Sequence, residues 1–183
     1  MKLVPPTLAH TDALAQKLRR ADCYELVLAR PGEHPLDVIR ESVDDSVIAE
    51  TILTPRGRVA GIWGVTSHPQ DGVGSIWMLA TPYLLEVATP FLKVCHHRIG
   101  QAHFHFPTLV CAPWRQNALH LKWLAWCGFQ AVDLGHEHFL PHVRTYNHRD
   151  AHDAGSVGGG GADAEQRAEQ GHRGPTDCAE PEH

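Results

Sequence analysis

The chain has 183 residues, of which 43% are hydrophobic, and this suffices for one domain with an apolar core. No apolar run approaches the roughly 18 residues of a membrane-spanning helix, because Arg, Lys, His or Pro interrupts every candidate. Residues 151–183 hold seven acids and two bases, so they carry the whole formal net charge of −5 and leave residues 1–150 neutral. A nucleic-acid-binding protein would carry a basic excess on its folded part, so nucleic acid is excluded as the expected partner.

The body of the chain predicts alternating strands and helices in the order β-α-α-β-β-β-α-β-α-β-β. Alternating or continuous apolar runs between turn residues predict the strands, and apolar residues at helical spacing predict the helices. The expected strands cover 2–6, 47–53, 59–66, 75–81, 108–111, 129–134 and 138–143, and the expected helices cover 11–26, 35–43, 82–101 and 117–127. Pro90 must start or kink the third of these helices, and the strand 75–81 is apolar enough to be central.

The C-terminal segment 149–183 contains a single Val and no Leu, Ile, Phe or Trp. Such a composition cannot bury enough apolar surface to offset the entropy of ordering the chain. We therefore predict a folded domain at 1–148 and a disordered, acidic, glycine-rich tail at 149–183. An interaction tail that becomes ordered on a partner is the alternative.

One segment resembles the GNAT superfamily of N-acetyltransferases. NALHLKWLAWCGF places Asn117, Gly128 and Phe129 at the spacing of the superfamily's last core helix. The resemblance covers about residues 2–143 and implies an α+β sandwich with a mixed central sheet of about seven strands and four helices. If acetyl-CoA binds, its implied contacts are Leu79, Thr81 and Asn117. No catalytic residue is assigned.

Two features of such an enzyme are missing. The superfamily binds the pyrophosphate of acetyl-CoA on a glycine-rich loop, because glycines let backbone N–H groups approach the phosphates. The corresponding stretch here, PYLLEVATP, has no Gly, Arg or Lys. The superfamily's general acid, a tyrosine, falls on Leu124, which cannot donate a proton. These departures predict no cofactor, no measurable acetyl-CoA binding at about 100 μM, and no acetyl transfer.

A narrower resemblance fits these departures. GNAT-like internal virion or morphogenesis proteins of short-tailed phages are similar in the stretch from Ile76 to Thr81 and in the segment with Asn117, His120, Trp123 and Gly128. This resemblance implies a non-catalytic role in virion assembly, with other virion or assembly proteins as partners. The implied location is the host cytoplasm during assembly, or the virion itself. An acetyl-CoA-dependent N-acetyltransferase with a degenerate loop is the alternative.

Histidines, cysteines and tryptophans raise three smaller hypotheses. Fifteen histidines suggest a metal site, but no Cys pair or HExxH spacing accompanies them, so we expect no metal. Cys111 and Cys127 could be nucleophiles, although their apolar surroundings favour a role as small core residues. We expect Trp77 and Trp123 to be largely buried, the alternative being that some tryptophans form a partner surface.

Overall fold

A computed structural model describes residues 1–146, so the predicted tail at 149–183 lies outside the described residues. Seven strands form one sheet in the order β1-β2-β3-β4-β5-β7-β6, with β4 at its centre. The β4–β5 pair is parallel and the other pairs are antiparallel. The strands are β1 (Lys2–Val4), β2 (Ser46–Leu53), β3 (Val59–Ser67), β4 (Val73–Ala80), β5 (Thr108–Cys111), β6 (Gln130–Ala131) and β7 (His142–Thr145). The expected α+β class with a mixed sheet is confirmed.

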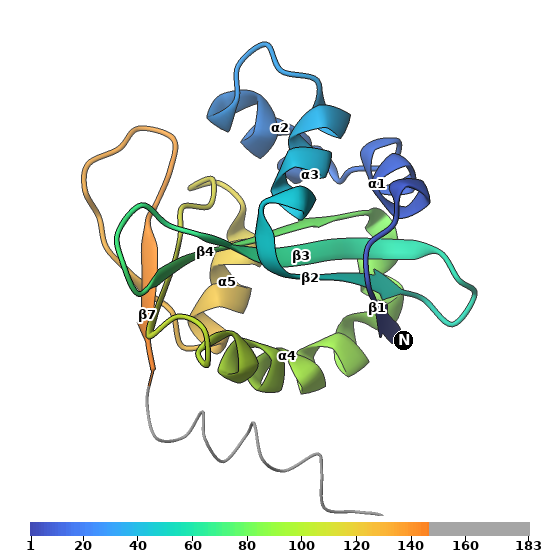
Figure 1. Cartoon of the computed structure of the whole chain (residues 1–183). Coiled ribbons are helices and arrows are strands. Elements are labelled where there is room, and N and C mark those ends of the chain that lie inside the picture. Colours follow the sequence, from blue (N-terminus) through green and yellow to red (C-terminus); the bar gives the residue numbers. More distant parts are fainter. Residues whose placement is uncertain (147–183) are drawn as a thin grey trace, which may run out of the picture.

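Helices cover both faces of this sheet. The first three pack on one face and α4 and α5 lie on the other (Figure 1). They are α1 (Leu8–Ala15), α2 (Arg20–Ala29), α3 (Pro35–Asp44), α4 (Ala88–Ala102) and α5 (Ala118–Trp126), and a 3-10 helix, η1 (Pro82–Val87), precedes α4. Within residues 1–146 there are thus five α-helices, one more than expected. None of these described helices is long and apolar enough to cross a membrane.

The additional helix arises because the expected helix at 11–26 is two helices, α1 and α2. No Gly or Pro lies between these two helices, and the break between them is caused by a tertiary contact. The backbone N–H of Arg19 donates to the carbonyl of Ala80 at 2.9 Å. The Asp22 carboxylate, which is 1% exposed, accepts from the Ala80 N–H at 2.9 Å and from the Arg19 guanidinium at 2.8 and 2.9 Å. The start of α2 is therefore fixed to the end of β4.

Strands β4 and β5 separate after a short stretch of pairing. Their parallel register comprises Val73–Thr108, Gly74–Leu109 and Ser75–Val110 and ends there. A Cβ at Gly74 would lie 2.7 Å from the ring of Phe106, so glycine is required where this ring packs on the strand. Between Ser75 and Ala80 the edge of β4 has no strand partner on the β5 side. The sheet is therefore splayed between these two strands.

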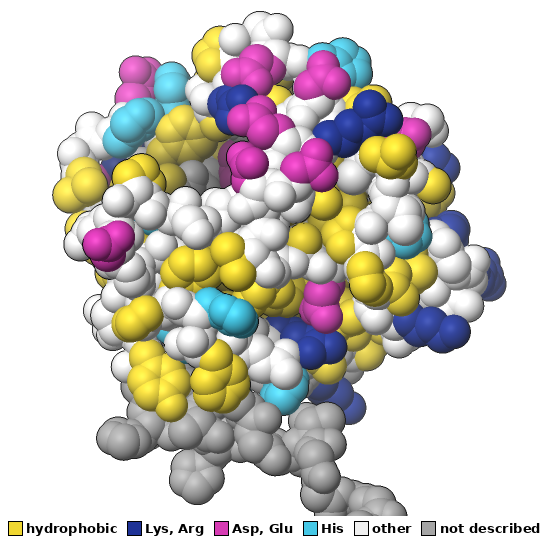
Figure 2. All heavy atoms as spheres, in the orientation of Figure 1, with side chains coloured by type: hydrophobic (Ala, Val, Ile, Leu, Met, Phe, Trp, Pro, Cys, Tyr) yellow, Lys and Arg dark blue, Asp and Glu magenta, His cyan; other side chains and the backbone are white. Residues whose placement is uncertain are grey.

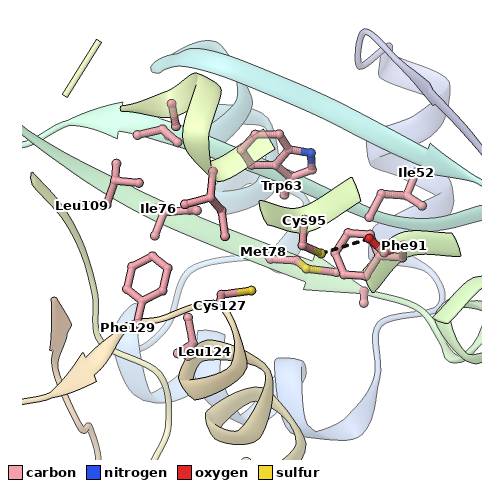
Figure 3. Packing of buried hydrophobic residues seen from close by; sticks show 14 of the residues in the cluster. Ile52, Trp63, Ile76, Met78, Phe91, Cys95, Leu109, Leu124, Cys127 and Phe129 are labelled. Atoms are coloured by element: carbon pink, nitrogen blue, oxygen red, sulfur yellow. Dashed lines mark hydrogen bonds between the residues drawn. The ribbon is translucent and has the colours of Figure 1, made fainter. Parts of the chain in front are cut away.

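The main core lies between the sheet and the α4–α5 layer (Figure 3). Gly128 ends α5 with φ 83°, and Phe129, 4% exposed, then packs into this core. Trp77 and Trp123 are neither fully buried nor exposed, and most of the surface of each is covered. The Trp77 ring packs over Gly64 of β3 and its Nε1 donates to Ser46 Oγ of β2 at 3.0 Å, whereas the Trp123 ring packs against Phe91 of α4.

Candidate functional site

Three adjoining hollows occupy the opening between β4 and β5, and together we call them the cleft. Met78 of β4 and His120 of α5 line all three. The hollow between η1, α4 and α5 has a cavity volume of about 130 Å³. A cavity of roughly this size can hold a small apolar group such as a benzene ring. The opening beside β4 can therefore take part of a ligand, such as a short acyl chain.

The walls of the cleft toward α4 and α5 are almost entirely apolar. The side chains that line this part are Met78, Leu84, Leu85, Ala88, Phe91, Leu92, Leu119 and Trp123, with Arg19 and His120 as the polar members. Leu85 and Leu119 are 72% and 56% exposed at the mouth. Hydrophobic side chains are visible at the surface over α4 and α5 (Figure 2). Such a lining suits an alkyl or acyl chain better than a charged group.

Two ionisable side chains from distant parts of the sequence meet in the wall of the cleft. Glu25 comes from α2 and His120 from the first turn of α5, and their side chains are 18% and 11% exposed. His120 Nδ1 lies 3.9 Å from Glu25 Oε2 and has no hydrogen-bond partner among the described residues. The same Oε2 accepts from the Trp114 N–H at 3.2 Å, which fixes the carboxylate beside the β5–α5 loop. An acid–imidazole pair thus faces an otherwise apolar space.

Cys111, at the end of β5, lines the cleft together with Glu25 and His120. Burial, aided by the negative charge of Glu25, raises the pKa of the Cys111 thiol to about 12. The thiol is therefore protonated at neutral pH, and a protonated thiol is a poor nucleophile. Cys127 lies in the core with 0% exposure. Hydrogen bonding to Cys95 and burial raise the pKa of the Cys127 thiol, as befits a small core residue.

The three residues that the resemblance implies as acetyl-CoA contacts are all buried. Leu79 packs in the second core, between the sheet and α1 and α3. Thr81 donates from its hydroxyl to the Val59 carbonyl at 2.8 Å and caps η1. Asn117 caps α5, where its Oδ1 accepts from the His120 N–H at 3.3 Å, and its Nδ2 is buried without a hydrogen-bond partner among the described residues. Only Leu79 lines the cleft directly.

The connection between β4 and α4 does not fit a pyrophosphate. The N–H groups of Tyr83 and Leu84 donate to Thr81 itself, at 3.2 and 3.1 Å. Pro82 and Pro90 have no N–H, and Pro90 lies in the first turn of α4. Two N–H groups of this connection are therefore engaged and two of its residues have none, and the stretch lacks the glycines of the superfamily's phosphate loop. Leu124, at the position of the missing tyrosine, is 1% exposed and packs in the core.

Other chemistry has little support within residues 1–146. No group of three or more His, Cys, Asp or Glu side chains in this part of the chain is arranged to hold a metal ion.

The Glu25–His120 pair could not be predicted from the sequence, because 95 residues separate its members and neither belongs to a catalytic motif. The available signal was a histidine three residues after the helix cap Asn117, on a mostly apolar helix.

Solved structures with the same architecture are N-acetyltransferases. The chain superposes on the PaiA N-acetyltransferase of Thermoplasma acidophilum in complex with coenzyme A, with TM-score 0.55, 12% identity and coverage of 79% of this chain and 98% of that one. The ribosomal-protein-alanine N-acetyltransferase of Brucella melitensis superposes with TM-score 0.56 and 12% identity, and the match covers 80% of this chain and 100% of that one. A protein described as a "putative phosphinothricin N-acetyltransferase" superposes with TM-score 0.56, 13% identity and coverage of 80% of this chain and 98% of that one. The chain has a GNAT-like fold. At these identities the likeness establishes the fold alone, and the chain matches no protein-family model and no curated protein.

Proposed function

We propose that the protein transfers an acyl group from a thioester donor to an amine, with the cleft between β4 and β5 as its active site. The observation that carries this proposal is the Glu25–His120 pair in the wall of a largely apolar opening. Aminolysis of a thioester needs a group that accepts the amine proton, and an imidazole beside a carboxylate is suited to this task. The N-acetyltransferases that share the fold support the same class of reaction.

The lining of the cleft indicates the kind of donor. Six apolar side chains between η1, α4 and α5 offer an acyl chain longer than acetyl a place to bind: Leu84, Leu85, Phe91, Leu92, Leu119 and Trp123. Each buried methylene contributes roughly 0.8 kcal/mol to binding. The missing phosphate cradle removes a few charge-assisted hydrogen bonds of about 1.5–3 kcal/mol each, enough to weaken a micromolar nucleotide ligand to millimolar. We therefore propose that the thioester arm and the acyl chain, rather than the nucleotide, hold the donor.

A non-catalytic role in phage virion assembly is the second candidate. It is favoured by the missing phosphate cradle and by Leu124 in place of the proton-donating tyrosine. The solved structures named above are acetyltransferases, and none is a virion protein. The phage role therefore depends on sequence resemblance alone, and we place it after the enzymatic one.

A thiol-release assay separates the two candidates. The donors are acyl-CoA thioesters from acetyl to decanoyl, and the amine acceptors are hydroxylamine and a pool of amino acids and short peptides. Acyl transfer predicts thiol release above the uncatalysed rate, increasing with chain length. No release with any donor, together with a flat calorimetric titration of decanoyl-CoA, would refute the enzymatic proposal and leave the assembly role.

A further inference from the structure

We infer that His120, oriented by Glu25, carries the proton in both halves of the reaction and so replaces the missing tyrosine. The inference deepens the proposed function and depends on it. His120 Nε2 accepts a proton from the attacking amine as the new C–N bond forms. The same proton then passes to the sulfur of the departing thiol as the C–S bond breaks. The products are an amide and a free thiol, and His120 returns to its starting state.

The position of His120 fits both halves of this cycle. Its side chain lines every hollow of the cleft, including the one toward η1 and α4 and the one toward α2 and β5. A donor entering between α4 and α5 and an acceptor entering beside α2 would therefore meet at this imidazole. Few other groups in the wall can exchange a proton. Arg19 and Arg98 also line the hollows but remain charged.

Glu25 sets the orientation of the ring. Its carboxylate faces Nδ1 at 3.9 Å, so the tautomer with a proton on Nδ1 is favoured and Nε2 is left as the basic atom. The two atoms are beyond hydrogen-bond distance in this structure, and catalytic groups often come into hydrogen-bond contact only when substrate is bound. Asn117 helps from the other side, because its side chain caps the helical turn that carries His120. Glu25 and Asn117 are thus positioning residues.

A covalent route through Cys111 is the chemical alternative. Cys111, His120 and Glu25 share one hollow, and an acyl group could pass first to the Cys111 sulfur and then to the amine. The route requires a thiolate, and the protonated state of the buried thiol opposes it. Direct transfer needs no change in the charge of Cys111. We therefore assign proton transfer to His120 and no covalent role to Cys111.

The test compares full-length wild type with His120→Gln, His120→Ala and Glu25→Gln in the thiol-release assay. His120→Gln should lower kcat by about 10²–10⁴-fold, and Glu25→Gln should lower it less, with KM little changed. Free imidazole should partly restore His120→Ala, because the truncation leaves room for it. The decrease of kcat in His120→Gln should be smaller for thioesters of acidic aryl thiols, because these thiols depart as thiolates and need no proton. His105→Gln, an exposed histidine outside the cleft, is the matched control and should retain full activity.

Each outcome bears on a different claim. No turnover by the wild type would overturn the proposed function and the role of His120 with it. Turnover that survives His120→Gln, or a loss that neither imidazole nor a better leaving group reduces, would overturn the role of His120 alone. If His120→Gln does not fold, the test is whether free imidazole restores the activity of His120→Ala: restored activity supports the role of His120, and no restoration overturns it. An acyl adduct on Cys111 in the mass spectrum of a donor-treated sample would favour the covalent route instead.

Discussion

Two strand-to-helix connections border the cleft, and they differ in what they offer a ligand. The β4–α4 connection is filled by η1, whose first N–H groups bond to Thr81 and whose flanks carry Pro82 and Pro90. The β5–α5 connection carries polar groups at the same cleft: Asn117 caps the helix, and His120 faces Glu25. The two connections thus differ in polarity: the β4–α4 side has few free donors near Thr81, and the β5–α5 side places an imidazole and a carboxylate at the cleft.

The largest expected effect concerns the packing that supports the β5–α5 connection. Phe129→Ala removes a buried ring behind α5, so unfolding should become about 3–5 kcal/mol easier. Chemical denaturation measures this change. Phe104→Ala, at a ring that is 69% exposed, is the control and should change stability by less than about 0.5 kcal/mol. A loss under about 1 kcal/mol for Phe129→Ala would mean that the end of α5 is not anchored as described.

A smaller effect separates the cap from the chemistry. Asn117→Ala removes the acceptor for the His120 N–H and should lower stability by about 1 kcal/mol, while kcat falls because the turn that holds His120 loosens. Thr7→Ala removes the corresponding cap of α1, a hydroxyl that accepts from the His10 N–H at 3.3 Å. This control should show a similar loss of stability with kcat unchanged. Equal activity in the two variants would contradict the positioning role of Asn117.

The smallest effect lies at η1. Glu86 pairs with Arg58, and both side chains are partly exposed. Glu86→Ala should therefore change stability by no more than about 0.5 kcal/mol. Losing this negative charge and freeing Arg58 should lower KM for acyl-CoA by about two- to threefold. Because acyl-pantetheine carries no phosphate, its KM should not change, and an equal change for both donors would show that η1 does not face the nucleotide.

The sequence predicted most elements that depend on local patterns and missed those that depend on distant contacts. The last hairpin is an exception, because the strand expected at 129–134 is only Gln130–Ala131 and the one expected at 138–143 lies at His142–Thr145. The strand at 108–111 was predicted to the residue, because a short apolar run lies between clear turn residues. The break between α1 and α2 has no local signal, since it arises where Arg19 bonds to Ala80. The same limit applies to the site. Asn117 was visible through its motif, whereas the pairing of Glu25 with His120 exists only after the sheet has formed.

The most direct test of the contrast between the two connections compares two donors with the same acyl chain, decanoyl-CoA and decanoyl-pantetheine. If the arm and the acyl chain hold the donor and the β5–α5 side supplies the chemistry, both should be turned over. Their kcat/KM values should then agree within about threefold, since the nucleotide contributes less than about 0.7 kcal/mol. Turnover of decanoyl-CoA alone, or a preference for it of a hundredfold or more, would contradict the account, as would inactivity toward both.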